Sequence, residues 1–166
     1  MQLNIRPAKH SDAEAIMRLL RQVNDVHADG RPDLFIHGKT KYNSEELEGI
    51  IDNPQTPIFV GETESGEIAG YCFCMVQDHT GSNNLRGIKT LYIDDLCIDE
   101  RMRGQHIGHQ IYDYVKSYAR EQGFYNLTLN VWSCNPGAMR FYESLGLKPQ
   151  KIGLEAVLFP EGAEHA

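Results

Sequence analysis

The chain has 166 residues with 16 basic and 23 acidic side chains, which give a formal net charge of −7. An acidic chain without a basic run argues against nucleic acid or an anionic membrane as a partner. The length suits a single core, so we expect residues 1–166 to form one domain. No run of about 18 apolar residues is present and the first residues do not resemble a signal peptide, so we expect a cytoplasmic protein.

The first half of the chain alternates between strand and helix signals. Ser11 and Glu14 form a capping box, which predicts a helix with apolar residues at helical spacing after it. The segment 24–43 contains glycine and proline and is predicted to be irregular. In chain order we expect a strand at 3–7, a helix from 11 to 23, the irregular segment, a helix at 43–53, strands at 58–62 and 67–76 joined by a hairpin turn, and a polar loop at 78–87.

All four cysteines lie in or beside apolar, strand-like segments. We therefore expect Cys72, Cys74, Cys97 and Cys134 to be buried free thiols. Cys72 and Cys74 have no matched second pair of ligands, so the sequence predicts no metal site.

Residues 90–108 have the pattern of a strand that turns into a helix. The part from Thr90 to Ile98 is rich in β-branched, aromatic and aliphatic residues, and Gly104 and Gly108 then open a stretch of helical period. The backbone N–H groups at a helix start, together with the positive end of the helix dipole, form a site for a phosphate or pyrophosphate. An ordinary tight turn between strand and helix would show the same glycines.

A second block, residues 130–147, predicts a helix with clear ends. Asn135 suits the N-cap, Pro136 the first helical position, and Gly146 the stop after the helix. An alternating strand at 125–131 precedes this helix, and one or two strands are expected within 150–159. The last residues, 161–166, are expected to be a frayed end.

With both blocks in view, the chain resembles the GNAT N-acetyltransferase superfamily. That family carries Arg/Gln-x-x-Gly-x-Gly/Ala after its fourth strand, matched here by Arg103 and Gly108, with His106 in place of the first glycine. It also carries Asn-x-x-Ala-x-x-Phe-Tyr-Glu-x-Leu-Gly-Phe, matched at Asn135, Ala138, Phe141, Tyr142, Glu143, Leu145 and Gly146, with Leu147 for the final Phe. The resemblance implies an α/β fold with a mixed, mostly antiparallel sheet that is splayed between strands 4 and 5 and flanked by helices.

The resemblance also implies roles for individual residues. The backbone N–H of Ile98 would polarise the thioester carbonyl, and the Tyr142 hydroxyl would act as an acid toward the departing sulfur. Without the motif, Tyr142 would be a helix tyrosine packed on the core. The implied acetyl-CoA-binding positions are Leu96, Cys97, Ile98, Arg103, Gly104, Gln105, His106, Ile107, Gly108, Asn135, Ala138 and Tyr142. The implied acceptor-binding positions are His27, Arg31, Tyr92, Asp94, Asn130 and Trp132.

Two of these assignments depend on local geometry. Asp94 and Asp95 lie in the middle of a predicted strand and point to opposite faces unless a bulge intervenes. By resemblance Asp94 is the preferred general base, acting through water; its alternative role is to cap backbone groups or to pair with a basic residue. We expect the ring of His106 to point away from the pyrophosphate while its backbone N–H remains in the turn. Asn130 stands where some members of the family place a glutamate base, and an amide cannot abstract a proton.

The predicted activity is transfer of the acetyl group of acetyl-CoA to a primary amine by direct attack in a ternary complex. The acidic charge favours a small cationic amine as acceptor. The alternatives are a protein or peptide N-terminal acetyltransferase, or a catalytically silent acyl-CoA-binding regulatory domain, which His106 hints at. Homodimers are common in this family, and the sequence identifies no interface.

Overall fold

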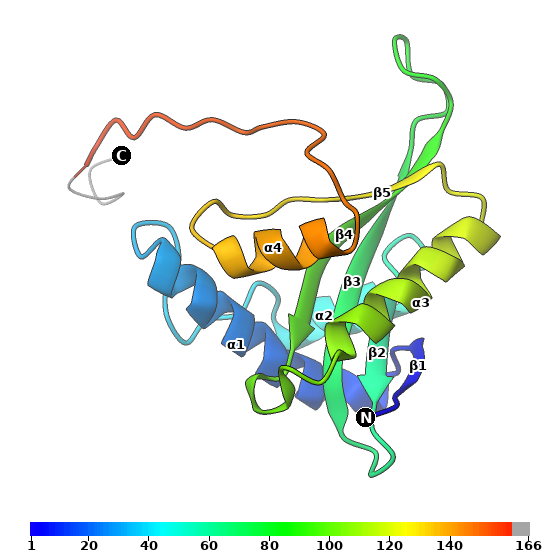
Figure 1. Ribbon diagram of the computed structural model, residues 1–166, viewed down its shortest axis with the longest axis vertical. Helices are drawn as coiled ribbons and strands as arrows, with labels where there is room; N and C mark the ends of the chain where they lie inside the picture. The colour runs from blue at the N-terminus through cyan, green and yellow to red at the C-terminus, as the bar shows by residue number, and fades with distance from the viewer. Residues whose placement is uncertain (161–166) are drawn as a thin grey trace. The chain divides into compact units, whose positions relative to one another are not determined.

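A single five-stranded sheet forms the centre of the fold. The computed structural model describes residues 1–160, so the expected frayed end at 161–166 lies outside the described residues. The strands follow the chain order across the sheet, antiparallel except for the parallel pair of the last two (Figure 1). They are β1 (Asn4–Pro7), β2 (Ile58–Glu62), β3 (Ile68–Asp78), β4 (Lys89–Ile98) and β5 (Asn126–Leu129). The predicted α/β class and the mixed, mostly antiparallel sheet are thereby confirmed.

The helices begin and end largely where local signals place them. They are α1 (Ala13–Gly30), α2 (Ser44–Asp52), α3 (Ile107–Glu121) and α4 (Pro136–Ser144), with short 3₁₀ turns at His10–Asp12 and Glu100–Met102. Asn43 caps α2 in a capping box with Glu46, and the Asn135 side chain accepts a hydrogen bond from the Ala138 N–H at 3.1 Å. Gly146 has a φ of 85°, as the predicted helix stop requires.

Three local predictions are wrong. Helix α1 continues to Gly30, because the fully buried Ala28 anchors a last turn that the sequence signals as irregular. The predicted capping box of Ser11 and Glu14 does not form. The hydrogen bond lies earlier in the chain, where the Lys9 backbone N–H donates to the Asp12 carboxylate at 2.8 Å, at the 3₁₀ turn before α1. No strand forms within 150–159, although the residues there are apolar.

The described chain divides into two compact units. The first contains residues 1–23 and 40–130, and therefore the whole sheet with α2 and α3. The second contains residues 24–39 and the chain from Val131 onward, and therefore α4. Our expectation of one domain over 1–166 remains a prediction.

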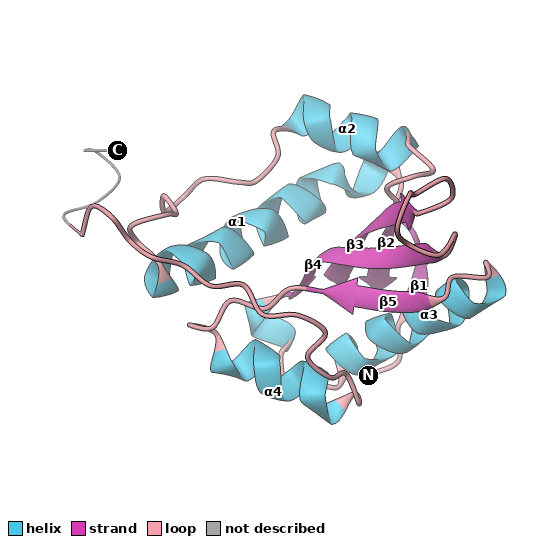
Figure 2. Cartoon of the chain, turned by 90° about the horizontal axis from the view of Figure 1, so that it is seen from above, coloured by secondary structure: helices cyan, strands magenta, loops and turns pink. Residues whose placement is uncertain are grey.

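Within the first unit, helices cover both faces of the sheet. The N-terminal part of α1 and helix α2 lie on one face and α3 on the other (Figure 2). The core of the first face joins two helices and three strands through buried residues: Ile16, Leu19, Leu20, Leu47, Ile58, Val60, Ile68, Tyr71, Phe73 and Cys97. Burial of such side chains stabilises the fold by roughly 1.5–3 kcal/mol each.

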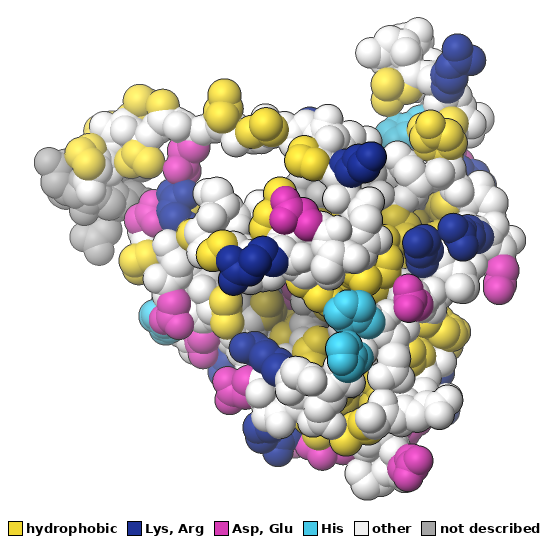
Figure 3. All heavy atoms as spheres, viewed as in Figure 1, with side chains coloured by type: hydrophobic (Ala, Val, Ile, Leu, Met, Phe, Trp, Pro, Cys, Tyr) yellow, Lys and Arg dark blue, Asp and Glu magenta, His cyan; other side chains and the backbone are white. Residues whose placement is uncertain are grey.

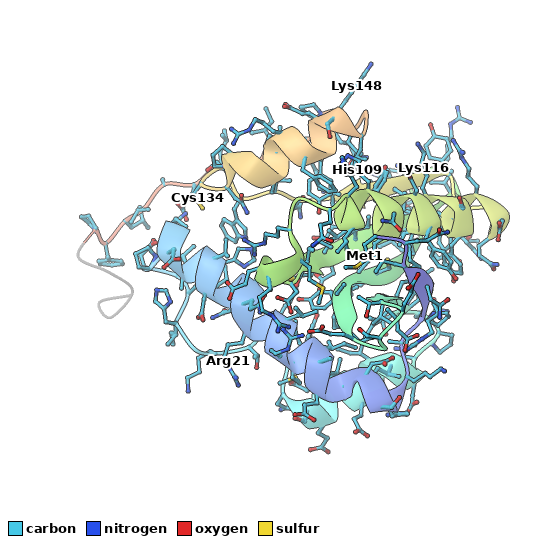
Figure 4. All side chains as sticks on the ribbon, turned by 60° about the horizontal axis from the view of Figure 1, so that its bottom comes forward. Met1, Arg21, His109, Lys116, Cys134 and Lys148 are labelled. Carbon is cyan, nitrogen blue, oxygen red and sulfur yellow. The ribbon has the colours of Figure 1, made fainter. Side chains whose placement is uncertain are left out.

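On the opposite face, α3 lies against two glycines of the sheet. A Cβ atom at Gly61 would meet Ile111 Cδ1 at 3.2 Å, and a Cβ at Gly70 would meet the same atom at 3.1 Å. Both glycines therefore allow the fully buried Ile111 to approach the strands closely. The chain start is tied to the same helix, because Gln110 Nε2 donates to the Met1 carbonyl at 2.9 Å (Figure 4).

In the second unit, the segment after α4 is extended and exposes its apolar side chains. Figure 3 shows hydrophobic side chains one after another along this segment. Its exposed large hydrophobic residues are Ile152, Leu154, Val157, Leu158 and Phe159. Its described backbone makes no regular secondary structure between residues 147 and 160. Arg31 pairs with Glu155 of this segment at 2.9 Å and with Asp33 at 2.6 Å. The segment is thus held to the turn that follows α1.

A buried carboxylate fixes the exit of β4. Asp99 directly follows the strand and has no exposed surface, and its backbone N–H donates to the Ala69 carbonyl at 2.9 Å. Its side chain accepts hydrogen bonds from the Arg18 and Arg101 guanidinium groups and from the Arg101 backbone N–H at 3.0 Å. These partners hold the pKa of Asp99 well below its usual range, first through Arg101 and then through Arg18. The start of the β4–α3 connection is therefore anchored by charge-assisted hydrogen bonds.

We expect Asp99→Asn to lower the free energy of unfolding by about 2 kcal/mol at pH 7, because hydrogen bonds to a buried charge are lost. The folded protein keeps Asp99 ionised to lower pH than the unfolded chain does. The carboxylate therefore stabilises the fold above its unfolded pKa of about 4, and this contribution falls as the pH drops below that value. Urea unfolding at pH 7 and pH 3 measures both effects. Glu100→Gln, a matched change at the exposed neighbour, should leave the unfolding midpoint nearly unchanged.

Candidate active site

A β-bulge in β4 positions two acidic side chains. Phe73 of β3 pairs with Asp95, and the next residue, Cys74, pairs with Ile93, so Asp94 is an extra residue in the ladder. The bulge shifts the alternation of β4, and consecutive carboxylates turn toward one face. Asp94 contacts Tyr42 and Asp95 contacts Tyr71, both on the face of the sheet that α1 and α2 cover. Without a bulge, we had expected the two carboxylates to point to opposite faces.

Asp94 is held by two neighbouring residues from the segment before α2. The Lys41 ammonium lies 2.8 Å from each Asp94 carboxylate oxygen, and the Tyr42 hydroxyl donates to Oδ2 at 3.0 Å. The side chain of Asp94 is 11% exposed and that of Lys41 52%. The alternative role foreseen for Asp94, pairing with a basic residue, is therefore present in this structure.

Asp95 lies in a more apolar environment than Asp94. The Tyr71 hydroxyl donates to its Oδ2 at 2.6 Å, and Tyr71 itself is fully buried. Burial raises the pKa of Asp95 to about 6, against the hydrogen bond from Tyr71, which lowers it. The negative charge of Asp94 raises this pKa further. The pKa of Asp95 therefore lies closer to neutral pH than that of an ordinary carboxyl group.

A small cavity opens beside these carboxylates. It has a volume of about 190 Å³ and is lined by Tyr42, Ile50, Thr56, Phe73, Cys74, Met75 and Asp94. The Tyr42 ring stacks on Phe73 with a centroid distance of 5.7 Å. A larger cavity of about 310 Å³ lies near β1 and the end of α2 and contains none of the predicted site residues.

Farther along β4, the pairing with β5 ends while β4 continues. Parallel pairing joins Thr90–Ile93 to Asn126–Leu129, and β4 then runs on to Ile98. Asn130, the first residue after β5, donates through Nδ2 to the Tyr92 hydroxyl at 3.1 Å. The structure thus brings Tyr92 and Asn130 together at the point where the two strands separate.

The turn from Arg103 to Gly108 leads directly into α3. Gly104 has a φ of 78° and nothing within 4 Å of the position of its missing Cβ. The first turn of α3 carries no acidic residue, and its N-cap, His106, makes no side-chain capping hydrogen bond. Figure 4 shows His109 near this end of the helix and Lys116 farther along it. The turn therefore has the open space and the positive field that an anion requires.

The predicted residues His27, Arg31, Trp132 and Tyr142 belong to the second unit. Rings of His27, Phe35 and Trp132 form one cluster, with centroid distances of 5.1 Å from His27 to Phe35 and 5.4 Å from Phe35 to Trp132. Tyr142 lies on α4 with its ring 5.1 Å from that of Phe141. Arg31 is engaged by two carboxylates rather than presented alone.

Sequence reasoning missed Lys41, Tyr42 and Tyr71, which complete the surroundings of the two carboxylates. Their contacts span 53, 52 and 24 residues in the chain, so no local pattern signals them. Three cysteines are buried as predicted, and Cys134 is exposed, contrary to the prediction. The Cys97 thiol lies 3.6 Å from the Leu19 carbonyl oxygen, in the core beneath α1. Its side chain therefore points into the core, and only its backbone is left to contact a ligand beside β4.

Residues 1–160 contain neither a metal-binding cluster nor a membrane-spanning helix. Within that part of the chain no group of three or more His, Cys, Asp or Glu side chains could hold a metal ion. None of the helices described there is long and apolar enough to cross a membrane.

Comparison with known proteins gives consistent matches over most of the chain. The sequence model of the acetyltransferase (GNAT) family matches residues 20–147. The chain is 27% identical to the peptidyl-lysine N-acetyltransferase YjaB of Salmonella typhimurium, over 89% of this chain and 85% of that protein. It is 29% identical to the thialysine N-epsilon-acetyltransferase of Bos taurus, over 86% of this chain and 82% of that one. The crystal structure of a mutant of the BH1408 protein from Bacillus halodurans superposes with a TM-score of 0.89 at 30% identity, covering 94% of this chain and 99% of that one.

His106 is the one residue other than glycine with a positive φ in the described chain, at 58°. A side chain in the left-handed region costs about 1 kcal/mol, which explains why the family motif has glycine there. We expect His106→Gly to raise the free energy of unfolding by about 0.5–1 kcal/mol, measured by urea denaturation. Gln105→Gly at the preceding position, where φ is not positive, should give no such gain. Equal effects of the two changes would contradict this assignment of strain.

Proposed function

Because the chain belongs to the GNAT acetyltransferase family, we propose that it transfers the acetyl group of acetyl-CoA to a small cationic primary amine. The transfer would occur by direct attack in a ternary complex. The family assignment supports acetyl transfer, and the names of two relatives refer to acetylation of lysine-type amines. A lysine-type amine is a primary amine on a flexible chain, which agrees with the proposed acceptor.

The bulge of β4 is the observation that carries the proposal. It turns Asp94 and Asp95 toward one face and places Asp94 on the wall of an otherwise largely apolar cavity. A cation with an apolar stem fits such a site, because the carboxylate needs a positive partner when it is removed from water. The overall charge of −7 favours the approach of a cation to the protein.

The donor would bind along the end of β4 and over the following turn. Backbone amides from Arg103 to Gly108 would hold the pyrophosphate, supported by the open space at Gly104 and the uncapped start of α3. Backbone groups of Leu96, Cys97 and Ile98 would contact the pantetheine arm. Asn135 caps α4 through Oδ1, so its Nδ2 would be the atom that meets the same arm.

The chemistry requires one proton to leave the amine and one to reach the sulfur. The amine nitrogen would form a bond to the carbonyl carbon while the carbon–sulfur bond breaks. The Ile98 N–H would stabilise the negative charge on the carbonyl oxygen, Asp94 would take the amine proton, and the Tyr142 hydroxyl would protonate the thiolate. Asp95, with its pKa near 6, is a second carboxylate on the same face that could receive the proton.

Further residues would contribute to the acceptor surroundings. Tyr92 and Asn130 would border the amine from β4 and β5, where their side chains are hydrogen-bonded to each other. The ring cluster of His27 and Trp132 would offer aromatic faces to a cation. Arg31 would act indirectly, by holding Asp33 and Glu155.

Donor binding can be tested by a change of charge in the turn. Gln105→Glu should weaken acetyl-CoA binding by about tenfold, because a negative side chain would face the pyrophosphate within one Debye length. Gln105 is exposed, so the change should not disturb the core. Gln122→Glu adds the same charge at the other end of α3 and should leave the affinity unchanged in calorimetry. Equal affinity for native protein and Gln105→Glu would place the pyrophosphate elsewhere.

The catalytic proposal is tested by release of free CoA with a panel of amines, amino acids, polyamines and peptides. The native protein should release CoA with cationic primary amines, and Tyr142→Phe should lower kcat about 100-fold with little change in acetyl-CoA affinity. Tyr125→Phe removes the same hydroxyl from an exposed tyrosine and serves as the control. Absence of CoA release with every acceptor would favour the silent acyl-CoA-binding alternative. An unchanged kcat in Tyr142→Phe would return Tyr142 to a packing role.

A further inference from the structure

The ion pair between Lys41 and Asp94 joins two side chains of unlike exposure. Asp94 is nearly buried at 11%, whereas half of Lys41 remains in contact with solvent. A carboxylate in that position needs a cation or a proton, since burial of an unpaired charge is costly. An ion pair with one exposed partner contributes little to stability, because solvent screens it. The carboxylate is therefore a fixed feature of the site, while its present cation is easily exchanged.

The surroundings of Asp94 recognise an ammonium group by more than charge. The Tyr42 hydroxyl orients the carboxylate by its hydrogen bond to Oδ2, and Lys41 Nζ lies 5.5 Å from the centroid of the Tyr42 ring. A cation at this distance from an aromatic face is attracted by the ring. Tyr42 is itself held in place by its stacking on Phe73. The carboxylate and the ring together make a preformed cation position.

Next to this cation position lies the cavity of about 190 Å³. Asp94 is the one charged residue of its lining, and the other lining residues are aliphatic, aromatic, sulfur-containing or hydroxyl-bearing. An alkyl chain in the cavity would remove apolar surface from water on both sides. The combination suits an ammonium group carried on a short alkyl stem.

We propose that Asp94, Tyr42 and this cavity form a binding site for the primary alkylammonium group of the acceptor, with Lys41 as an internal occupant that the acceptor displaces. The proposal rests on the proposed function and deepens it, because it defines the acceptor as a primary amine on an apolar stem. Lys41 would act as a specificity-determining residue: a ligand without a cation cannot replace it and leaves Asp94 paired as it is. A cationic ligand restores the charge balance of Asp94 as Lys41 turns to solvent.

An internal occupant lowers apparent affinity by the fraction of time that it fills the site. Removing it should therefore strengthen binding of the external cation. For a pair of this exposure, we expect Lys41→Met to bind n-butylammonium roughly two- to fivefold more tightly than the native protein in calorimetry. Lys39→Met makes the same charge change two residues earlier at an exposed position and should bind as the native protein does. Asp94→Asn in the Lys41→Met background should bind n-butylammonium at least tenfold more weakly, and n-butanol should not distinguish the variants.

Two results would overturn the proposal. One is equal or weaker binding of n-butylammonium by Lys41→Met relative to Lys39→Met, which would make Lys41 part of the scaffold. The other is undiminished binding after Asp94→Asn in the Lys41→Met background, provided that thermal melting shows a folded protein. Calorimetry with this probe requires no turnover, so its outcome is independent of the CoA-release test. Cation binding without CoA release would reject the proposed activity and leave the ammonium site standing.

Discussion

The bulge at Asp94 is the constraint on which the rest of β4 depends. Before it, Ile93 pairs with Cys74; after it, Asp95 pairs with Phe73, so the odd-numbered residues change face along the strand. The first part of β4 therefore supplies side chains to the α3 side and the second part supplies Cys97 to the core beneath α1. Because of one inserted residue, β4 contributes side chains to the packing on both faces of the sheet. The same residue brings the carboxyl groups of Asp94 and Asp95 to one face at the bulge.

Three acidic residues of β4 and its exit show three ways of keeping a carboxyl group away from water. Asp99 is surrounded by guanidinium groups, and its pKa falls. Asp95 receives a phenol hydrogen bond in a buried position, and burial raises its pKa to about 6. Asp94 has an ammonium group that is half exposed. The guanidinium groups balance the charge of Asp99 at the exit of β4, where the carboxylate anchors the structure. Asp94, whose cation is half exposed, is the carboxylate that lines the cavity.

Much of the fold could be predicted from the sequence because local chemistry determines it. Asn43, Asn135 and Gly146 act within one helical turn, so their signals can be read without knowledge of distant contacts. The last turn of α1 depends on the burial of Ala28, and apolar residues after α4 do not become a strand without a partner strand. The bulge depends on the register of β3 against β4, and the contact of Lys41 with Asp94 spans 53 residues. Such features arise from tertiary structure and leave no periodic trace.

The seating of α3 on Gly61 and Gly70 links the middle of the sheet to the turn that we propose for the donor. Ile111 occupies space that one additional carbon on either strand would take, at distances of 3.1–3.2 Å. A methyl group at Gly61 or Gly70 would press on the end of the Ile111 side chain, and at Gly70 it would also meet the Cys97 carbonyl oxygen at 2.7 Å. The turn from Arg103 to Gly108 is continuous with the start of that helix and would move with it. The two glycines therefore help to set the distance between α3 and the sheet. A change of packing at either glycine that shifts α3 would also shift the turn, and donor affinity would then change although no residue of the turn is altered.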